Sequence, residues 1–278
     1  MKALKINPLE RSVAFIGLLI SFSLLSISAF AQVPDGVYPN VTDAKGLKQG
    51  AWKKLDDQGT CVYIGQFKDD KPYGVFTYFD TDGKKMTEMD FLNGGPVAYG
   101  KMFGVNGMLQ AQGKYLNQLK DSLWTFYTDD GLLLSEEWYV NGKKEGKSVT
   151  YHPGTKQPAE IVNYKNGLEE GPWVQYYQDG KKEGEGVYLD GNYDGKQVWY
   201  FPDGKINIMG NYQHAVKDGI WVYYTEDATT GYTIKGKETW KLGKCVSGEQ
   251  VIKDDDFKKQ AEDSSDQNQQ GQDPNDPH

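Results

Sequence analysis

Few side chains of this sequence could carry out acid–base or metal chemistry, and they lie far apart. Beyond residue 31 the histidines are His152, His214 and the terminal His278. His152 precedes a Pro-Gly pair, and His214 takes the place that a turn glycine holds elsewhere in the chain, so we expect both in turns. The two lie about 60 residues apart with no cysteine beside them, which does not make a zinc site. The sequence therefore predicts no catalytic residue, no metal site and no cofactor.

Aromatic side chains, in contrast, are abundant: the sequence has 19 tyrosines, 11 phenylalanines and 7 tryptophans. One set recurs at equivalent positions: Trp52, Phe76, Trp124, Trp173 and Trp221. A second set lies three residues later: Leu55, Phe79, Tyr127, Tyr151, Tyr176, Tyr200 and Tyr224. Three residues along a strand lead to the opposite face unless a bulge intervenes, so aromatic side chains are expected on both faces of a sheet.

Two interpretations of these rings stay open at the level of sequence. In the first, each ring packs on its equivalent in the next repeat, and the resulting ladder is the core itself. In the second, some rings stay open as a platform for a sugar or a protein segment, because a single-layer sheet cannot bury both faces completely. Trp124, Trp173 and Trp221 are then the candidate partner-binding or glycan-binding residues.

The elements that position these rings follow from an internal repeat. The pattern Tyr-x-Asn-Gly-x-x-x-Gly-x-Trp-x-x-Tyr-x-x-Asp-Gly is written about eight times, most clearly from Tyr164 to Gly180. Its central glycine falls at Gly50, Gly74, Gly100, Gly146, Gly171, Gly195 and Gly219, with Ser122 in its place once. The spacing of 22 to 26 residues is typical of stacked supersecondary units and not of one globular core.

Each repeat reads as a β-hairpin. Asn-Gly and Asp-Gly pairs tolerate the positive φ of tight turns, and the segments between them are rich in aromatic and β-branched residues. An isolated hairpin is marginal in water, so each unit must take stability from its neighbours. We predict an all-β fold over residues 50–248: an elongated, single-layer antiparallel meander of about eight stacked hairpins, or about 16 strands.

The first 31 residues predict export. Lys2, Lys5 and Arg11 precede an apolar run that ends in Ala29-Phe30-Ala31, a signal-peptide pattern with cleavage before Gln32. The predicted signal helix is short for a membrane span, although retention as an anchor is the alternative. The expected location is the periplasm, the cell surface or the extracellular space.

Two further segments flank the repeats. Residues 32–49 form a lead-in segment with a glycosylation sequon at Asn40, which we interpret as a chance occurrence. Residues 249–278 have too little apolar content to order and are predicted to be a disordered acidic tail.

Charge and cysteine content limit the partners. Removal of residues 1–31 changes the formal net charge from −8 to −10 and leaves no arginine. Guanidinium groups are preferred readers of phosphates, so the acidic chain argues against nucleic acid or anionic lipid. Cys61 and Cys245 lie at opposite ends of the repeats, roughly 65 Å apart at about 4.8 Å per strand. They cannot bridge within one chain, because a disulfide needs Cα atoms within about 7 Å; an intermolecular bridge stays open.

Four stretches carry a resemblance to a known family: Phe67 to Gly83, Tyr139 to Gly154, Tyr164 to Gly180 and Tyr188 to Gly204. Their ordered aromatic, Asn or Asp, and two glycines resemble the MORN repeat, in particular the variant family described as antitoxin-like. The resemblance implies one β-hairpin per repeat, an elongated sheet, and a role in contacting other proteins or membranes. It implies no catalytic residues. Ser122 and the longer link after Gly94 depart from the pattern.

The leading hypothesis is therefore a non-catalytic, exported repeat scaffold that mediates protein–protein interaction at the bacterial envelope or cell surface. Two alternatives are a glycan-binding surface protein that uses the aromatic ladder, and an antitoxin or immunity-type protein that neutralises a toxin. A secreted hydrolase would require His152 or His214 beside a buried carboxylate and a nucleophile.

Overall fold

The computed structural model describes residues 36–92, 94–227 and 231–248. The chain divides into two units, residues 1–37 and 38–278, and the strands all lie in the second. No helix long and apolar enough to cross a bilayer occurs among the described residues. The predicted signal helix and acidic tail lie outside the described residues. The described part confirms an all-β fold built on a single antiparallel sheet.

The sheet has 21 strands. They are β1 (Val41–Thr42), β2 (Lys48–Leu55), β3 (Cys61–Lys68), β4 (Lys71–Phe79), β5 (Lys85–Leu92), β6 (Val97–Phe103), β7 (Leu109–Leu116), β8 (Leu119–Tyr127), β9 (Leu133–Val140), β10 (Lys143–Lys144), β11 (Gly146–Tyr151), β12 (Pro158–Lys165), β13 (Leu168–Glu169), β14 (Gly171–Tyr176), β15 (Lys182–Leu189), β16 (Asn192–Tyr193), β17 (Gly195–Tyr200), β18 (Ile206–Gln213), β19 (Val216–Asp227), β20 (Gly231–Lys241) and β21 (Lys244–Gly248).

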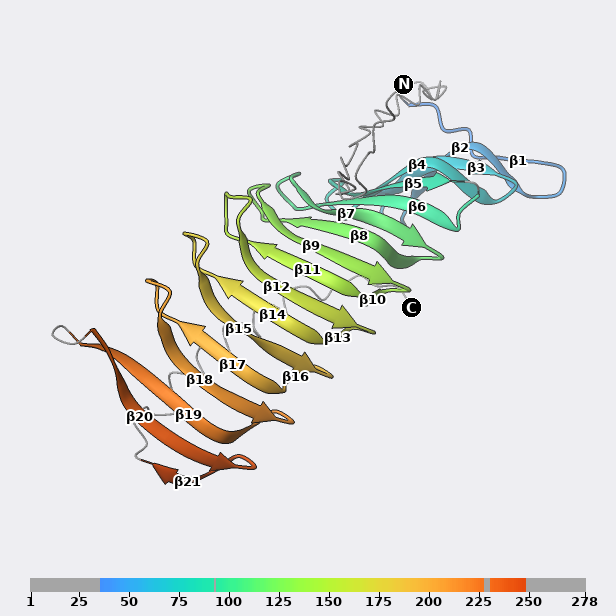
Figure 1. The fold of residues 1–278 in the computed structure, drawn as a ribbon. Coiled ribbons are helices and arrows are strands. Elements are labelled where there is room, and N and C mark those ends of the chain that lie inside the picture. Colours follow the sequence, from blue (N-terminus) through green and yellow to red (C-terminus); the bar gives the residue numbers. More distant parts are fainter. Residues whose placement is uncertain (1–35, 93, 228–230, 249–278) are drawn as a thin grey trace, which may run out of the picture. The chain divides into compact units, whose positions relative to one another are not determined.

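Each strand pairs with the strands before and after it in the sequence, so the chain runs through the sheet as a meander (Figure 1). Three elements, β10, β13 and β16, are two-residue pieces that continue into β11, β14 and β17 after one interrupting residue. Of the 19 elements from β2 to β20, these three merge with their continuations, which leaves the 16 strands that the repeat predicts.

The Asp-Gly turns form as their sequence predicts. At Asp179-Gly180 the amide of Gly180 donates to the carbonyl of Tyr177 (2.9 Å), and the Asp179 carboxylate accepts from the amide of Lys181 (3.0 Å). Gly180 has a φ of +85°, in the left-handed region where glycine has no Cβ penalty. The same bonds recur around Asp203-Gly204, one repeat later. Each hairpin is therefore closed by chemistry within the turn itself.

The central glycine of the repeat marks a local break in strand pairing. Gly171 has a φ of +87°, and Ser122, at the equivalent position, has a φ of +62°. Pairing of β7 with β8 shifts register between Gly113 and Lys114, opposite Ser122, as a β-bulge does. Gly100 differs from the other central glycines, because its φ is not positive and a Cβ there would be 2.8 Å from the ring of Tyr115.

The two faces of the sheet carry different side chains. We call the face of Trp52, Phe76, Trp124, Trp173 and Trp221 the core face. The opposite face, which carries Val75, Tyr99, Leu123 and Trp138, is the open face. Paired residues share a face, and the pairs Trp124 with Glu137 and Leu123 with Trp138 show the alternation.

Aromatic residues lie on both faces, as the three-residue offset predicts. The hydroxyl of Tyr151 donates to Glu136 at 2.7 Å. Glu137 shares the core face with its partner Trp124, so the preceding residue on β9, Glu136, points to the open face. The same relationship joins Tyr200 to Glu185. These two tyrosines of the second set therefore hydrogen-bond across neighbouring strands on the open face.

The lead-in segment and the cysteines complete the described part. Asn40 holds both backbone groups of Lys53: its Nδ2 donates to the Lys53 carbonyl (2.9 Å), and its Oδ1 accepts from the Lys53 amide (2.8 Å). The sequon nitrogen is thus engaged in the sheet, which supports the interpretation of the sequon as chance. Cys61 on β3 and Cys245 on β21 are free thiols, so the prediction that they do not bridge within the chain is confirmed.

Candidate functional site

The three tryptophans singled out as candidate binding residues lie inside the ladder on the core face. Trp124 and Trp221 are 0% exposed and Trp173 is 3% exposed. Trp124 packs edge to face on Tyr115 with 4.9 Å between the ring centroids, and Trp221 packs in the same way on Tyr212 with 5.1 Å between them. The three rings have no free face for a sugar, so the ladder interpretation replaces the platform interpretation for these positions.

Glycines on the preceding strand make room for the rings of Trp124 and Trp221. A Cβ at Gly113 would lie 2.3 Å from the Trp124 indole, and one at Gly210 would lie 2.1 Å from the Trp221 indole. Each indole Nε1–H then donates to a carbonyl ten residues earlier, that of Lys114 (3.0 Å) or Asn211 (3.1 Å). Each indole is therefore locked to the strand before it by both shape and hydrogen bonding.

Lysine side chains cover these rings on the core face. Among the described residues, no second layer of structure packs on that face. Lys120 Nζ lies 4.8 Å from the ring centroid of Trp124, and Lys217 Nζ lies 4.7 Å from that of Trp221. Lys144 lies over Tyr164 at 4.9 Å and forms a 3.0 Å ion pair with Glu137. The stem and charge of Lys144 therefore close the aromatic face.

Gln197 is a structural residue that sequence reasoning missed. It is 0% exposed, and it occupies the ladder position that Trp173 and Trp221 hold in neighbouring repeats. Its Oε1 accepts from the Trp173 indole at 3.0 Å, and its Nε2 donates to the Val187 carbonyl at 2.9 Å, again ten residues earlier. Gly186 lies against it as the other glycines lie against indoles. A glycine lies 11 residues before Gln197, as it does before Phe76, Trp124 and Trp221, and this spacing is the sequence signal that could have identified it.

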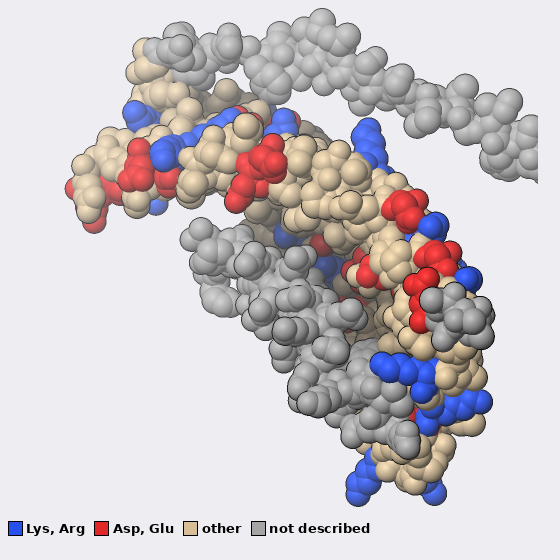
Figure 2. All heavy atoms as spheres, turned by 90° about the vertical axis from the view of Figure 1, so that its left-hand side faces the viewer, with Lys and Arg blue, Asp and Glu red and all other residues tan. Residues whose placement is uncertain are grey.

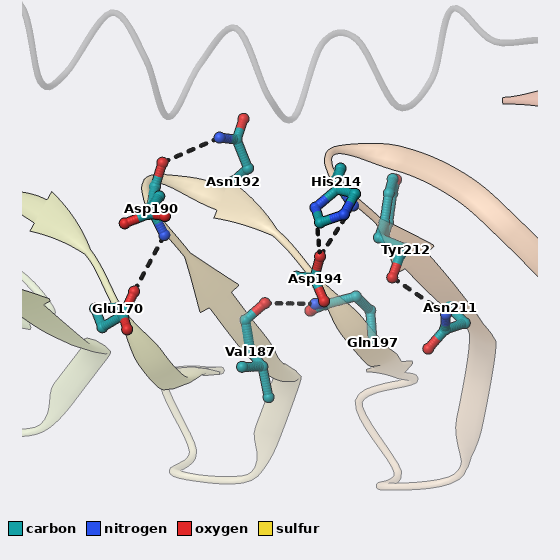
Figure 3. Close-up of polar contacts among 9 residues, drawn as sticks. All are labelled: Glu170, Val187, Asp190, Asn192, Asp194, Gln197, Asn211, Tyr212 and His214. Atoms are coloured by element: carbon teal, nitrogen blue, oxygen red, sulfur yellow. Dashed lines mark hydrogen bonds and ion pairs between the residues drawn. The ribbon is translucent and has the colours of Figure 1, made fainter. Parts of the chain in front are cut away.

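Both histidines belong to turns, in different ways. His152 Nε2 lies 2.9 Å from the Tyr176 carbonyl of the next repeat. His214 and Ala215 have φ values of 50° and 68°, so they take the Asn and Gly positions of an Asn-Gly turn, and the assignment of His214 to the glycine position was wrong. The His214 amide donates to Asp194 at 2.9 Å (Figure 3). These contacts give each histidine a structural role.

An acidic residue before the central glycine holds the next turn. Glu170 accepts from the amide of Asp190 at 3.1 Å, just as Asp194 accepts from His214 (Figure 3). Glu145 and Asn166 repeat the arrangement at 2.8 Å. Glu170 is therefore a link between turns about one repeat apart, which the alternation of hydrophobic residues does not reveal.

The open face carries a hollow of about 720 Å³ across β4 to β9. Its apolar lining comes from Val75, Tyr99, Leu123 and Trp138, of which Tyr99 is 53% and Trp138 is 50% exposed. The bulge opposite Ser122 leaves Leu123 outside the pairing of β7 with β8 and bends the strand here. These exposed rings were not singled out from the sequence.

Polar groups of both signs complete the hollow. Glu88, Asp90, Lys101 and Lys114 line it, two acids and two bases. The Lys114 ammonium lies 2.9 Å from Asp121, and this hydrogen bond lowers the pKa of the Asp121 carboxyl below its usual value. Asp90 Oδ1 is buried and has no hydrogen-bond partner. The hollow therefore offers two half-exposed ring faces within a lining of mixed charge.

Charges elsewhere on the surface are mixed as well. In the view of Figure 2, acidic and basic side chains are interspersed over the described residues instead of forming a field of one sign. Among these residues no group of three or more His, Cys, Asp or Glu is placed to hold a metal ion.

Comparisons with known proteins add little. No protein-family model matches the chain, and no curated protein matches it. A solved structure described as the crystal structure of TarM matches with 12% sequence identity and a TM-score of 0.22, over 41% of this chain and 18% of that chain. The match spans less than a fifth of the TarM chain, and a similarity this low carries no argument about fold or function.

Proposed function

We propose that the protein is a non-catalytic, exported repeat scaffold that binds another protein through the open face of its sheet. The observation that carries this proposal is a row of exposed apolar side chains on one face. Val75, Tyr99, Leu123 and Trp138 begin the row, and Val187 (41% exposed) and Ile220 (61% exposed) extend it to later repeats. Lys196 and Asn211, paired on β17 and β18, stand between Val187 and Ile220. Exposed apolar side chains rimmed by polar residues are a mark of interaction sites.

The chemistry of this row fits a protein partner. Tryptophan and tyrosine are enriched at the centres of protein interfaces, where polar and charged groups form the rim. Lysines and glutamates lie among and beside these apolar residues, such as Lys196 and Glu185, which line a second, smaller hollow. The partner we expect has an apolar contact surface with a polar rim of mixed charge.

Three further features of the proposal rest on the sequence. The segment 1–31 supports export to the periplasm, the cell surface or the extracellular space. The repeat pattern supports membership of the MORN-like class, whose resemblance implies contact with other macromolecules. An antitoxin or immunity-type role is the special case in which the bound protein is a toxin.

The test compares substituted scaffolds in capture from envelope fractions. The mature wild-type protein is expected to retain a saturable partner, and Val187→Glu and Ile220→Glu are each expected to lose it, because a charge enters the apolar contact. Val105→Glu is the matched control, since Val105 is 84% exposed and lies in a turn away from the open face. Equal capture by all four proteins, or no partner at all, would contradict the proposal.

A further inference from the structure

The hollow on the open face has the chemistry of a carbohydrate subsite. Tyr99 and Trp138 both line it and are each about half exposed, unlike the buried indoles of the ladder. Tyr99 lies on β6 and Trp138 on β9, three strand spacings or about 14 Å apart. Aromatic faces pair with the C–H faces of sugar rings, and this separation suits a short chain of sugars better than a single one.

The polar lining suits a neutral ligand with hydroxyl groups. Sugar hydroxyls can donate to the Glu88 carboxylate and accept from Lys101 and from the Gln112 amide, which all line the hollow. Because the lining holds two acids and two bases, it gives no net preference for a charged ligand.

We propose that this hollow binds a neutral oligosaccharide, with Tyr99 and Trp138 stacking on sugar rings and Glu88 and Lys101 hydrogen-bonding to hydroxyls. The site is local to β4 to β9. It shares Tyr99 and Trp138 with the apolar row proposed above, whose protein-binding test uses Val187 and Ile220 of later repeats. The residues differ from the three tryptophans expected from the sequence, because the buried indoles belong to the other face.

The test is titration of the protein from residue 32 onward with soluble cello-, chito-, malto- and xylo-oligosaccharides. Binding is measured by calorimetry and by tryptophan fluorescence. At least one series is expected to bind. Trp138→Leu and Tyr99→Leu are each expected to weaken binding about tenfold or more, because each removes a stacking face. The fluorescence change is expected to disappear in Trp138→Leu.

Two matched variants separate stacking from folding. Tyr99→Phe keeps the ring face and is expected to bind within a few-fold of wild type. Tyr73→Leu removes an exposed tyrosine of the same face that does not line the hollow, and it is expected to bind as wild type. No binding across the four series, or binding unaffected by Trp138→Leu and Tyr99→Leu, would overturn the assignment. Loss of the protein partner by Trp138→Leu without any sugar binding would instead place the hollow within the protein-binding surface.

Discussion

The indole Nε1–H of Trp173 donates a 3.0 Å hydrogen bond to Oε1 of Gln197, which stands 24 residues later at the equivalent position of the next repeat. Both side chains are buried. Most ladder positions connect to the strand before them, but this pair also connects one repeat directly to the next. It shows how units that are marginal alone become one cooperative sheet.

Substitution of Gln197 tests this connection. Gln197→Leu leaves both the Trp173 indole and the Val187 carbonyl without their partner, so we expect destabilisation of about 3 kcal/mol. Urea unfolding followed by circular dichroism measures it. In a Trp173→Phe background the same substitution is expected to cost about 1 kcal/mol less, since one orphaned group is gone. Additive effects of the two substitutions would exclude the proposed coupling.

Gly210→Ala tests the steric fit of the ladder. The new Cβ would lie 2.1 to 2.6 Å from three atoms of the Trp221 indole, and φ at this position is not in the left-handed region, so the cost is one of space alone. We expect destabilisation of about 1–3 kcal/mol in thermal or urea unfolding. A Trp221→Val background should relieve most of that cost. An unchanged unfolding midpoint in the wild-type background would show that the indole can move aside.

The Ala215 turn offers a stabilising substitution. Alanine at a φ of 68° is in the left-handed region, which costs about 1–2 kcal/mol for a residue with a Cβ. Ala215→Gly removes this cost, although glycine also stabilises the unfolded chain by a smaller amount because it has more conformational freedom there. We expect a net gain of about 0.5–1 kcal/mol by urea unfolding. Gly167→Ala is the reverse control: its φ is +90°, and its new Cβ would meet no atom closer than 3.8 Å, so about 1 kcal/mol or more should be lost. A loss of stability in Ala215→Gly would contradict the assignment of this turn.

Glu160 predicts a pH dependence. Burial, followed by the negative charge of Glu169, raises the pKa of the Glu160 carboxyl above its usual value, although Lys144 opposes the shift. A raised folded-state pKa means that the folded protein favours the protonated form. Its contribution to stability is therefore fully present below the unfolded pKa of about 4.3, and it is lost as the pH rises through the folded pKa.

Glu160→Gln removes this titration. The variant is expected to be more stable than wild type at neutral pH, and the difference should shrink as the pH falls below about 4. Urea unfolding of both proteins across this range measures the difference. A variant whose disadvantage grew with rising pH would show that the ionised carboxylate is the favoured form in the folded protein.

The turns and the strand order could be predicted from the sequence because their causes are local. Asn166 and Asp190 adopt positive φ, and glycines follow them, as Asn-Gly and Asp-Gly pairs require. His214 with Ala215 was harder to place, because neither residue has the turn propensity of the pair that it replaces. Gln197 was missed for a related reason: an amide at a tryptophan position looks like a surface residue until its two buried partners are seen.

The sequence by itself determined the repeat, the hairpins and the antiparallel meander, since each depends on backbone preferences within a few residues. Only the tertiary structure decided which aromatic rings are buried. Side chains alternate between the two faces of a strand with a period of two residues, so residue spacing alone does not show which face is buried. Glycines such as Gly113 admit an indole on one face, whereas Trp138, beside Leu123 on the other, has no such neighbour and stays half exposed.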